Sequence, residues 1–373
     1  MNNVIIVREL EVQLSQAIKE CKADRLFILT DSNTEQLCLP VVSKFDCLRG
    51  AEPISIAADD TNKGLDAVTH VWSELQRLGA TRHSLLINLG GGMVTDLGGF
   101  AASTFKRGIA YINIPTTLLS MVDASVGGKT GFNFGGLKNE IGVFSIPRCV
   151  FLDTQFLKTL DHENILSGYA EMLKHGLISD EPTWAELLTF PLESLEKPDC
   201  LENPECLDNP ERPEKPVELA DMLAKSVAVK KRIVEEDPTE LGIRKALNLG
   251  HTVGHAIESL AMSGTADGRL KPILHGYAVA YGLVCELYLS VIKTGFPVER
   301  MRQTVRFIHE HYGRMPITCD DYPTLLQLMT HDKKNTANEI NFTLLHDVGQ
   351  LALNQTATTA EIEEALDFYR EGA

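Results

Sequence analysis

The feature that most constrains this chain is an alternation of short apolar runs with polar turns and helix-like segments over its first 155 or so residues. Runs this short have the length of buried strands, and the segment from Asp66 to Leu78 carries its apolar residues at helical spacing. Strands that alternate with helices predict a largely parallel sheet covered by helices. The six runs are Val4–Val7, Leu26–Leu29, Ile54–Ala57, Leu85–Leu89, Tyr111–Ile114 and Val150–Leu152.

The second half of the chain follows a different pattern. From about Asp161 the apolar residues recur with a helical period, which predicts a mostly helical region. Because 373 residues exceed what one hydrophobic core usually supports, we expect two domains: an α/β, Rossmann-like domain at 1–158 and an all-α domain at 159–373. Within the second, Glu339–Leu353 alternates as a small hairpin would, and the segment 190–216, rich in Pro, Glu and Asp, predicts an exposed connector.

Composition excludes several classes of protein. A net charge of −16 argues against a nucleic-acid partner, which needs a basic surface. We see no apolar run near the ~18 residues of a membrane helix and no secretory signal, so we expect no membrane partner and a cytosolic location. Eight cysteines without a C-x-x-C pair predict thiols rather than a disulfide framework. A small anionic ligand remains compatible, because it needs only a local cluster of Lys and Arg.

Two features of the first half point to a nucleotide. Gly90–Gly92 follow a predicted strand and precede a helix expected near Val94, where backbone amides can approach a diphosphate. The segment is not G-x-G-x-x-G, so a simple tight turn is an equal alternative. Asp31 ends the second predicted strand and could bind a ribose, or merely form a turn. Since both lie at carboxyl ends of strands in one sheet, together they favour a dinucleotide site.

The helical half carries a group of regularly spaced polar residues. Arg244, Asn248, His251 and His255 follow at steps of four, three and four, which on one helix would form a single polar stripe. Burying such a stripe without partners is costly, so it should face a ligand, a metal or a polar cavity. The His pair is compatible with a metal, but it is not H-E-x-x-H. Further candidates, each of which could equally be packed or solvated, are Glu171, Lys174 and His275.

Basic residues are distributed through both halves. In an acidic chain most of them form solvated pairs. Lys129 differs, because Gly127 and Gly128 precede it and the segment suits an anion held by backbone and ammonium together. The set comprises Arg107, Lys129, Lys138, Lys174, Lys230, Arg244, Lys333 and Lys334.

From about Asp31 to Asn335 the chain resembles the 3-dehydroquinate synthases. The resemblance implies an amino-terminal nucleotide-binding domain and a helical carboxyl-terminal domain with the active site between them. It departs at Asp60, where the family usually has Glu, at Tyr277, and at His175. The matching segments are Gly90-Gly-Gly-Met-Val-Thr-Asp96, Pro115-Thr-Thr-Leu-Leu119, Val122-Asp-Ala-Ser-Val-Gly-Gly-Lys-Thr-Gly131, Lys138-Asn139, Ala170-Glu-Met-Leu-Lys174, Leu247-Asn-Leu-Gly-His-Thr-Val-Gly-His-Ala-Ile-Glu258, Leu274-His-Gly276 and Asp332-Lys-Lys334.

The resemblance also implies roles for particular residues. The ligands of Zn²⁺, or of Co²⁺ in its place, would be Glu171, His251 and His275, with His255 a non-ligand near the phosphate. NAD would contact Asp31, Asp60, Lys63, Gly91, Gly92, Met93, Val94, Thr95, Asp96, Thr116, Thr117, Lys129, Lys138, Phe156, Leu157, Lys158 and Thr159. The catalytic set would be Asp123, Lys129, Lys174, Lys230, Arg244, Asn248 and His255, and further substrate contacts would come from Arg107, Asn139 and one of Lys333 or Lys334.

The activity that the resemblance implies is conversion of 3-deoxy-D-arabino-heptulosonate 7-phosphate to 3-dehydroquinate, with transient oxidation by NAD. Arg107 would reach the phosphate across a homodimer interface. Three alternatives remain open: a related cyclase such as 2-deoxy-scyllo-inosose synthase, a metal-dependent polyol dehydrogenase, and an inactive homologue that only binds nucleotide. Arg244 and Lys230 favour a substrate with a carboxylate.

Overall fold

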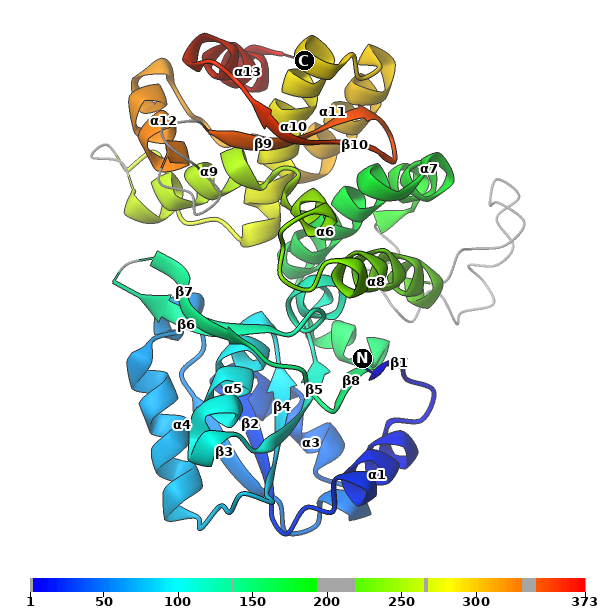
Figure 1. Cartoon of the computed structure of the whole chain (residues 1–373), viewed down its shortest axis with the longest axis vertical. Helices are drawn as coiled ribbons and strands as arrows, with labels where there is room; N and C mark the ends of the chain where they lie inside the picture. The colour runs from blue at the N-terminus through cyan, green and yellow to red at the C-terminus, as the bar shows by residue number, and fades with distance from the viewer. Residues whose placement is uncertain (1–2, 136, 193–218, 265–267, 331–339, 373) are drawn as a thin grey trace. The chain divides into compact units, whose positions relative to one another are not determined.

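The computed structural model describes residues 3–135, 137–192, 219–264, 268–330 and 340–372 (Figure 1). Chain contacts divide it into two compact units. The first comprises Met1–Asp161 and Leu219–Val227, and the second comprises His162–Glu218 and Ala228–Ala373. The expected domain limits, 1–158 and 159–373, and the expected active site between the domains stay predictions. Most of the acidic connector at 190–216 lies outside the described residues.

The first unit is built on a six-stranded sheet of parallel strands in the order β1-β8-β5-β4-β2-β3. All six apolar runs that predict strands are confirmed, and the α/β fold class is confirmed with them. The strands are β1 (Asn3–Ile6), β2 (Leu26–Asp31), β3 (Glu52–Ile56), β4 (Leu85–Gly90), β5 (Ala110–Pro115) and β8 (Cys149–Leu152).

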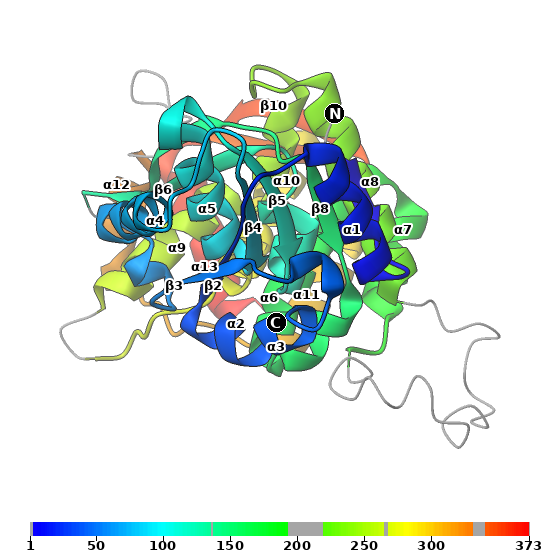
Figure 2. The same ribbon diagram turned by 90° about the horizontal axis from the view of Figure 1, so that it is seen from below.

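Helices cover both faces of this sheet. Figure 2 shows α4 and α5 on one face and α1 and α3 toward the other. Val68, Val71 and Leu75 project from α4 at helical spacing into a core shared with Phe27 and Leu29 of β2. The helical segments are α1 (Leu10–Cys21), α2 (Ser32–Leu37), α3 (Leu39–Val42), η1 (Asp46–Leu48), η2 (Asp60–Asn62), α4 (Leu65–Arg77), α5 (Gly92–Thr104), η3 (Phe105–Arg107), η4 (Ser120–Ala124) and η5 (Thr154–Thr159).

The order of the strands places a topological switch between β2 and β4. After β2 the chain adds β3 on one side, and then returns to the other side of β2 to place β4, β5 and β8. Ligands of open α/β sheets collect outside the carboxyl ends of the strands at such a point. The carboxyl ends here are Asp31 and Gly90, which the sequence singled out independently.

A hairpin that the sequence did not predict extends the first unit. Strand β6 (Lys129–Phe134) pairs antiparallel with β7 (Leu137–Phe144). The glycines and polar residues between its apolar positions hide the strand alternation. Four large apolar side chains of the hairpin are exposed, and they are distributed over both of its faces: Phe134, Ile141, Val143 and Phe144.

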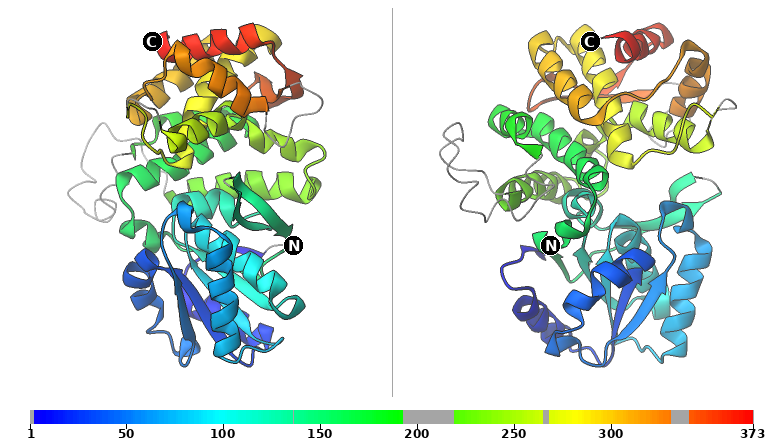
Figure 3. Two further views of the ribbon diagram at one scale, coloured as in Figure 1. Left: turned by 90° about the vertical axis from the view of Figure 1, so that its left-hand side faces the viewer. Right: turned by 180° about the vertical axis from the view of Figure 1, so that it is seen from behind.

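The second unit packs its helices around α10 (His275–Thr294). This helix contacts α6, α9, α11, α13 and β9 (Figure 3). The prediction of a helical second half is confirmed, as is the hairpin around Gly349. Helix α8 (Leu219–Glu236) belongs to this unit from Ala228 onward. The other elements are α6 (His162–Ser179), α7 (Glu181–Thr189), η9 (Ile243–Asn248), α9 (His251–Ser263), α11 (Val298–Tyr312), η10 (Cys319–Asp321), α12 (Tyr322–Thr330), β9 (Asn341–Asp347), β10 (Gln350–Thr356) and α13 (Thr359–Glu371).

By length and composition, helix α10 is long and apolar enough to cross a membrane. The expectation that the chain has no apolar run of this length was wrong at α10. Of its most apolar 18 residues, 72% is buried inside the protein, so α10 has the character of a core helix.

Candidate functional site

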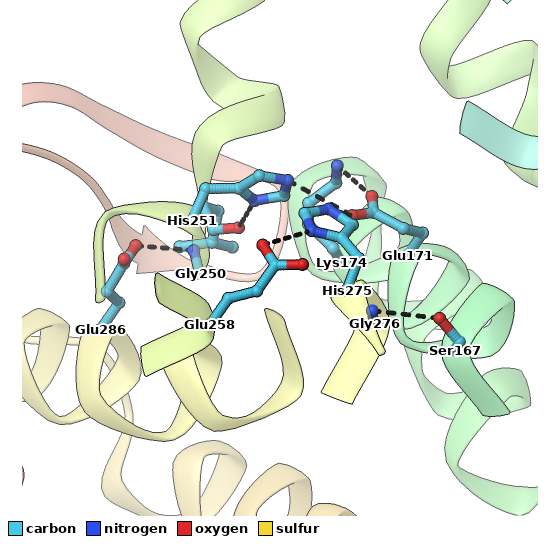
Figure 4. A network of polar contacts seen from close by, with 10 residues as sticks. Ser167, Glu171, Lys174, Gly250, His251, Glu258, His275, Gly276 and Glu286 are labelled. Carbon is cyan, nitrogen blue, oxygen red and sulfur yellow. Dashed lines mark hydrogen bonds and ion pairs between the residues drawn. The ribbon is translucent and has the colours of Figure 1, made fainter. Parts of the chain in front are cut away.

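Three residues predicted as metal ligands converge in the second unit. Glu171 lies in the middle of α6, whereas His251 and His275 are the first residues of α9 and α10. The Nε2 atoms of the two histidines lie 3.3 Å and 3.6 Å from the same carboxylate oxygen, Oε1 of Glu171 (Figure 4). Side chains from three separate helices therefore meet within one small volume.

The other nitrogen of each histidine faces a hydrogen-bond acceptor. Nδ1 of His251 lies 3.0 Å from the carbonyl oxygen of Leu249, and Nδ1 of His275 lies 3.3 Å from Oε2 of Glu258. In the neutral form each ring would keep its proton on Nδ1, which leaves the lone pair of Nε2 directed toward Glu171. This second interaction is how metal-binding histidines are usually oriented.

The carboxylate of Glu171 supports the same interpretation. Both of its oxygens are buried, and neither has a hydrogen-bond partner of normal geometry among the described residues. Lys174, one turn later on α6, forms an ion pair with Oε2. A buried carboxylate oxygen facing two imidazole lone pairs is the donor set of a zinc site, so the residues present fit a divalent cation.

The pKa values differ between the two histidines of this cluster. Burial alone would raise the pKa of Glu171, but Lys174 and the two histidines hold it well below its ordinary value. Burial and Lys174 lower the pKa of His251 to about 3, so this imidazole stays neutral. Burial opposes charge on His275 too, yet Glu258 and Glu171 raise its pKa to about 10. A proton on His275 thus offsets part of the negative charge of Glu171 and Glu258, which a bound cation would otherwise offset.

His255 lies beside these residues. Its ring centroid is 5.2 Å from that of His251 and 5.7 Å from that of His275, and ligand atoms of the three histidines lie within 4.8 Å of one another. The three histidines could therefore hold a cation together. The choice of Glu171, His251 and His275 as the ligand set, with His255 outside it, stays a prediction.

The prediction that Arg244, Asn248, His251 and His255 share one helix is wrong. Arg244 and Asn248 lie on the short helix η9, and α9 begins only at His251. Gly250 separates the two segments with a φ of 78°, a left-handed conformation that ends one helix and turns the chain before the next. Arg244 and Asn248 lie on one helix, and His251 and His255 lie on the next. The sequence pattern did not reveal the turn between them.

A carboxylate that the sequence reading missed organises the turn before η9. Asp237 accepts hydrogen bonds from the backbone N–H groups of Leu241, Gly242 and Arg244 at 3.0, 2.7 and 3.0 Å. The buried guanidinium of Arg244 donates to the carbonyl oxygen of Pro238 at 2.7 Å. Lys230, on the second-unit part of α8, is also buried.

In the first unit, two of the predicted nucleotide-binding segments, at Asp31 and at Gly90–Gly92, lie at the switch point of the sheet. Gly91 caps α5 without any side-chain hydrogen bond, so the first amides of this helix receive no cap from a side chain there. Asp31 accepts hydrogen bonds from the backbone of Asn33 and Thr34, both at 2.9 Å, and caps α2. The turn-forming alternative for Asp31 is thus real, and its contact with a ribose stays a prediction.

Lys63 links two of the predicted groups. Its buried ammonium donates to Oδ2 of Asp96 at 2.7 Å and to Oδ1 of Asn139 at 2.6 Å. Asn139, expected among the substrate contacts, therefore lies beside residues expected to bind NAD. It adopts a φ of 48°, which is unusual for a residue other than glycine.

The remaining predicted residues lie on several elements of the first unit. Met93, Val94 and Thr95 belong to the first turns of α5, and the expected start of that helix near Val94 is two residues late. Lys333 and Lys334 lie outside the described residues, and the side chain of Asp60 is not described. The others are Thr116 and Thr117 after β5, Asp123 on η4, Lys129 and Lys138 on the β6–β7 hairpin, Phe156, Leu157, Lys158 and Thr159 on η5, and Arg107 on η3.

Comparison with known proteins identifies relatives over nearly the whole chain. Two consecutive family models match, 3-dehydroquinate synthase N-terminal over residues 53–167 and 3-dehydroquinate synthase C-terminal over residues 168–335. A 3-dehydroquinate synthase of Parabacteroides distasonis is 50% identical over 368 residues, which cover 99% of this chain and 98% of that protein.

Solved structures share the fold at lower identity. A 2-epi-5-epi-valiolone synthase of Streptomyces hygroscopicus, with NAD⁺ and Zn²⁺ bound, is 24% identical with a TM-score of 0.82, and the match covers 100% of this chain and 98% of that one. A 2-deoxy-scyllo-inosose synthase, in complex with carbaglucose-6-phosphate, NAD⁺ and Co²⁺, is 22% identical with a TM-score of 0.77 over 100% and 97% of the two chains. At these identities the similarity establishes the fold alone.

Proposed function

The chain belongs to the 3-dehydroquinate synthase family and is a lyase, and from this premise we propose that it converts 3-deoxy-D-arabino-heptulosonate 7-phosphate into 3-dehydroquinate and phosphate. The observation that carries the proposal is the convergence of Glu171, His251 and His275 on one small volume. The substrate carries a phosphate and a carboxylate, and the chain supplies buried or glycine-flanked cations suited to both.

We propose Zn²⁺ as the metal, with Co²⁺ as a substitute, held by Glu171, His251 and His275. NAD is proposed to bind at the switch point of the sheet, where the uncapped start of α5 suits its diphosphate. When bound, the metal supplies a Lewis acid for the substrate hydroxyl groups, and NAD supplies a reversible hydride acceptor.

The chain's own residues bind and orient the substrate in this proposal. Lys129, Asn139 and Arg107 hold the phosphate, with one of Lys333 or Lys334. Arg244 and Lys230 pair with the carboxylate, and both are buried, so their charges are screened little by water. Fixing both ends of a flexible chain brings its reacting carbons toward the geometry needed for ring closure. An oxygen of the substrate's own phosphate acts as the base for elimination.

We further propose a cytosolic homodimer in which Arg107 reaches the partner's substrate. Arg107 is exposed and adopts a φ of 71°, a conformation that costs free energy and is often retained for function. The exposed apolar side chains of β6 and β7 are compatible with an interface, because burial of apolar surface favours association.

One assay tests the activity. The purified protein is incubated with the heptulosonate phosphate, NAD and Zn²⁺, and phosphate and dehydroquinate are measured together. We expect equal amounts of both products and no net NADH, because the hydride returns to the product. Accumulating NADH would identify a polyol dehydrogenase instead. Turnover only of a sugar phosphate that lacks a carboxylate would identify another cyclase and would exclude the proposed roles of Arg244 and Lys230.

A further inference from the structure

Two buried glutamates connect the helices that carry the metal-binding histidines. Glu258 lies on α9 and is 3% exposed, and Glu286 lies on α10 and is 0% exposed. Neither belongs to the proposed ligand set or to the proposed substrate contacts. Burying a carboxylate is costly unless it is hydrogen-bonded, so the groups that each one contacts indicate why it is there.

Each glutamate reaches the histidine-bearing end of the opposite helix. Glu258, from α9, accepts from Nδ1 of His275, the first residue of α10, at 3.3 Å. Glu286, from α10, accepts from the backbone N–H of Gly250 at 2.6 Å and of Val253 at 3.1 Å, on either side of His251. Figure 4 shows the contact of Glu258 with His275 and that of Glu286 with Gly250, next to the cluster around Glu171.

The contacts of Glu286 suit the start of a helix. The first N–H groups of α9 have no partners within the helix, and they carry partial positive charge. No side chain caps α9 at Gly250 itself, so Glu286 provides from α10 what a local cap would provide elsewhere. It thereby fixes the turn that sets the direction of the His251 side chain.

The helices approach closely enough for these contacts to be rigid. A Cβ atom at Gly282 would lie 1.9 Å from the carbonyl oxygen of Gly250, and one at Gly254 would lie 2.7 Å from that of Ala278. The backbones of α9 and α10 therefore touch. A third bond, from the N–H of Gly276 to Oγ of Ser167 at 3.1 Å, ties the start of α10 to α6, which carries Glu171.

We propose that Glu258 and Glu286 are positioning residues that form a reciprocal clamp, each holding the metal-binding histidine of the other's helix in the orientation that the cation requires. This inference rests on the metal site of the proposed function. Glu258 acts through the imidazole of His275, and Glu286 acts through the backbone that carries His251.

The test measures Zn²⁺ affinity directly, by competition with a chromophoric chelator and without substrate or NAD. Glu258→Ala should weaken affinity about 10- to 100-fold, the usual effect of removing such an outer partner. Glu258→Gln should recover most of it, because the amide oxygen still accepts from Nδ1. Glu286→Gln should weaken affinity about 10-fold, since its single oxygen cannot accept from both N–H groups.

A second readout separates positioning from general stability. The visible spectrum of the Co²⁺-loaded protein reports ligand geometry, and it should change in Glu286→Gln but not in the matched control Ser290→Ala. Ser290 is also buried on α10, one turn beyond Glu286. Its Oγ donates to the backbone carbonyl oxygen of Glu286 at 2.7 Å and accepts from the N–H of Leu345 at 3.2 Å, and neither of these partners lies on α9.

The outcomes distinguish this inference from the function on which it rests. If the parent protein binds no Zn²⁺, the metal site and the clamp are both wrong. If the parent binds Zn²⁺ and the glutamate variants keep its affinity and the Co²⁺ spectrum, the clamp alone is overturned. An equal loss in Ser290→Ala and Glu286→Gln would assign Glu286 a purely structural role.

Discussion

The two candidate sites of this protein are built from different materials. The nucleotide region of the first unit is made largely of backbone, at the glycine turn after β4 and the uncapped start of α5. The metal cluster of the second unit is made of side chains from three helices. The backbone site depends on the absence of a Cβ atom and of a helix cap. The side-chain site depends on the convergence of side chains from separate helices. The two should therefore fail separately and under different substitutions.

The largest effect is expected from His275→Ala. The variant should lose bound metal and at least about a thousandfold in turnover, since a Lewis acid contributes several kcal/mol. It should keep its fold and its affinity for NAD, because the other site uses none of these side chains. Metal analysis, NAD titration and circular dichroism check this. His346→Ala, an exposed histidine of the same unit, is the control. Full metal content in His275→Ala would show that the ligand assignment is wrong.

A smaller effect, in the opposite site, is expected from Gly90→Ala. The new Cβ would lie 2.5 Å from Cγ2 of Val94, so the first turn of α5 must shift. Overpacking of this kind costs about 1–3 kcal/mol of stability, and a misplaced helix start should weaken NAD binding by about tenfold. Calorimetric titration with NAD measures this, and metal content should be unchanged.

Gly64→Ala is the matched control for Gly90→Ala, because a Cβ there meets nothing within 4 Å and the backbone is extended, with a φ of −118°. If Gly90→Ala bound NAD as tightly as this control, the glycine turn would not be the diphosphate site. If it instead lost metal, the independence of the two sites would be refuted.

The smallest effect is expected from Asp237→Asn, which alters the carboxylate that accepts from the backbone N–H of Arg244. Burial opposes the charge of Asp237, but hydrogen bonds from Gly242, Arg244 and Leu241 hold its pKa below the ordinary value. A lowered pKa adds stability that is fully present above the ordinary aspartate pKa and is lost as pH falls through the lowered value. The variant should therefore differ from the parent at neutral pH and converge with it in acid.

Urea unfolding at several pH values checks the change in stability. We also expect KM to rise several-fold with little change in kcat, and steady-state kinetics checks this part of the role of Asp237. Asp320→Asn, at an exposed position, serves as the control. A stability difference between Asp237→Asn and the parent that stayed constant from neutral to acid pH would contradict this assignment.

The fold was predictable to the extent that it follows local pattern. The runs that became β2 and β4 are apolar, short and bounded by turns, so their strands could be recognised. The β6–β7 hairpin was missed because glycines and polar residues interrupt its alternation. The polar stripe was misread across Gly250, since spacing alone cannot show that a helix ends and another begins.

The candidate sites could be predicted where they resemble known motifs. Glu171, His251 and His275 came from the family resemblance, whereas spacing alone suggested pairing His251 with His255. Glu286 could not have been found from sequence, because its partners are backbone N–H groups 33 and 36 residues away. The only sequence signal was a glutamate in an otherwise apolar helix, and this signal does not indicate which groups the glutamate binds.

The close crossing at Gly250 and Gly282 has a consequence for any residue larger than glycine. A Cβ atom at Gly282 would lie 1.9 Å from the carbonyl oxygen of Gly250, so a side chain there would force the backbones of α9 and α10 apart. These two helices begin with His251 and His275, so a substitution at Gly282 would disturb the spacing of the two imidazoles without altering either of them.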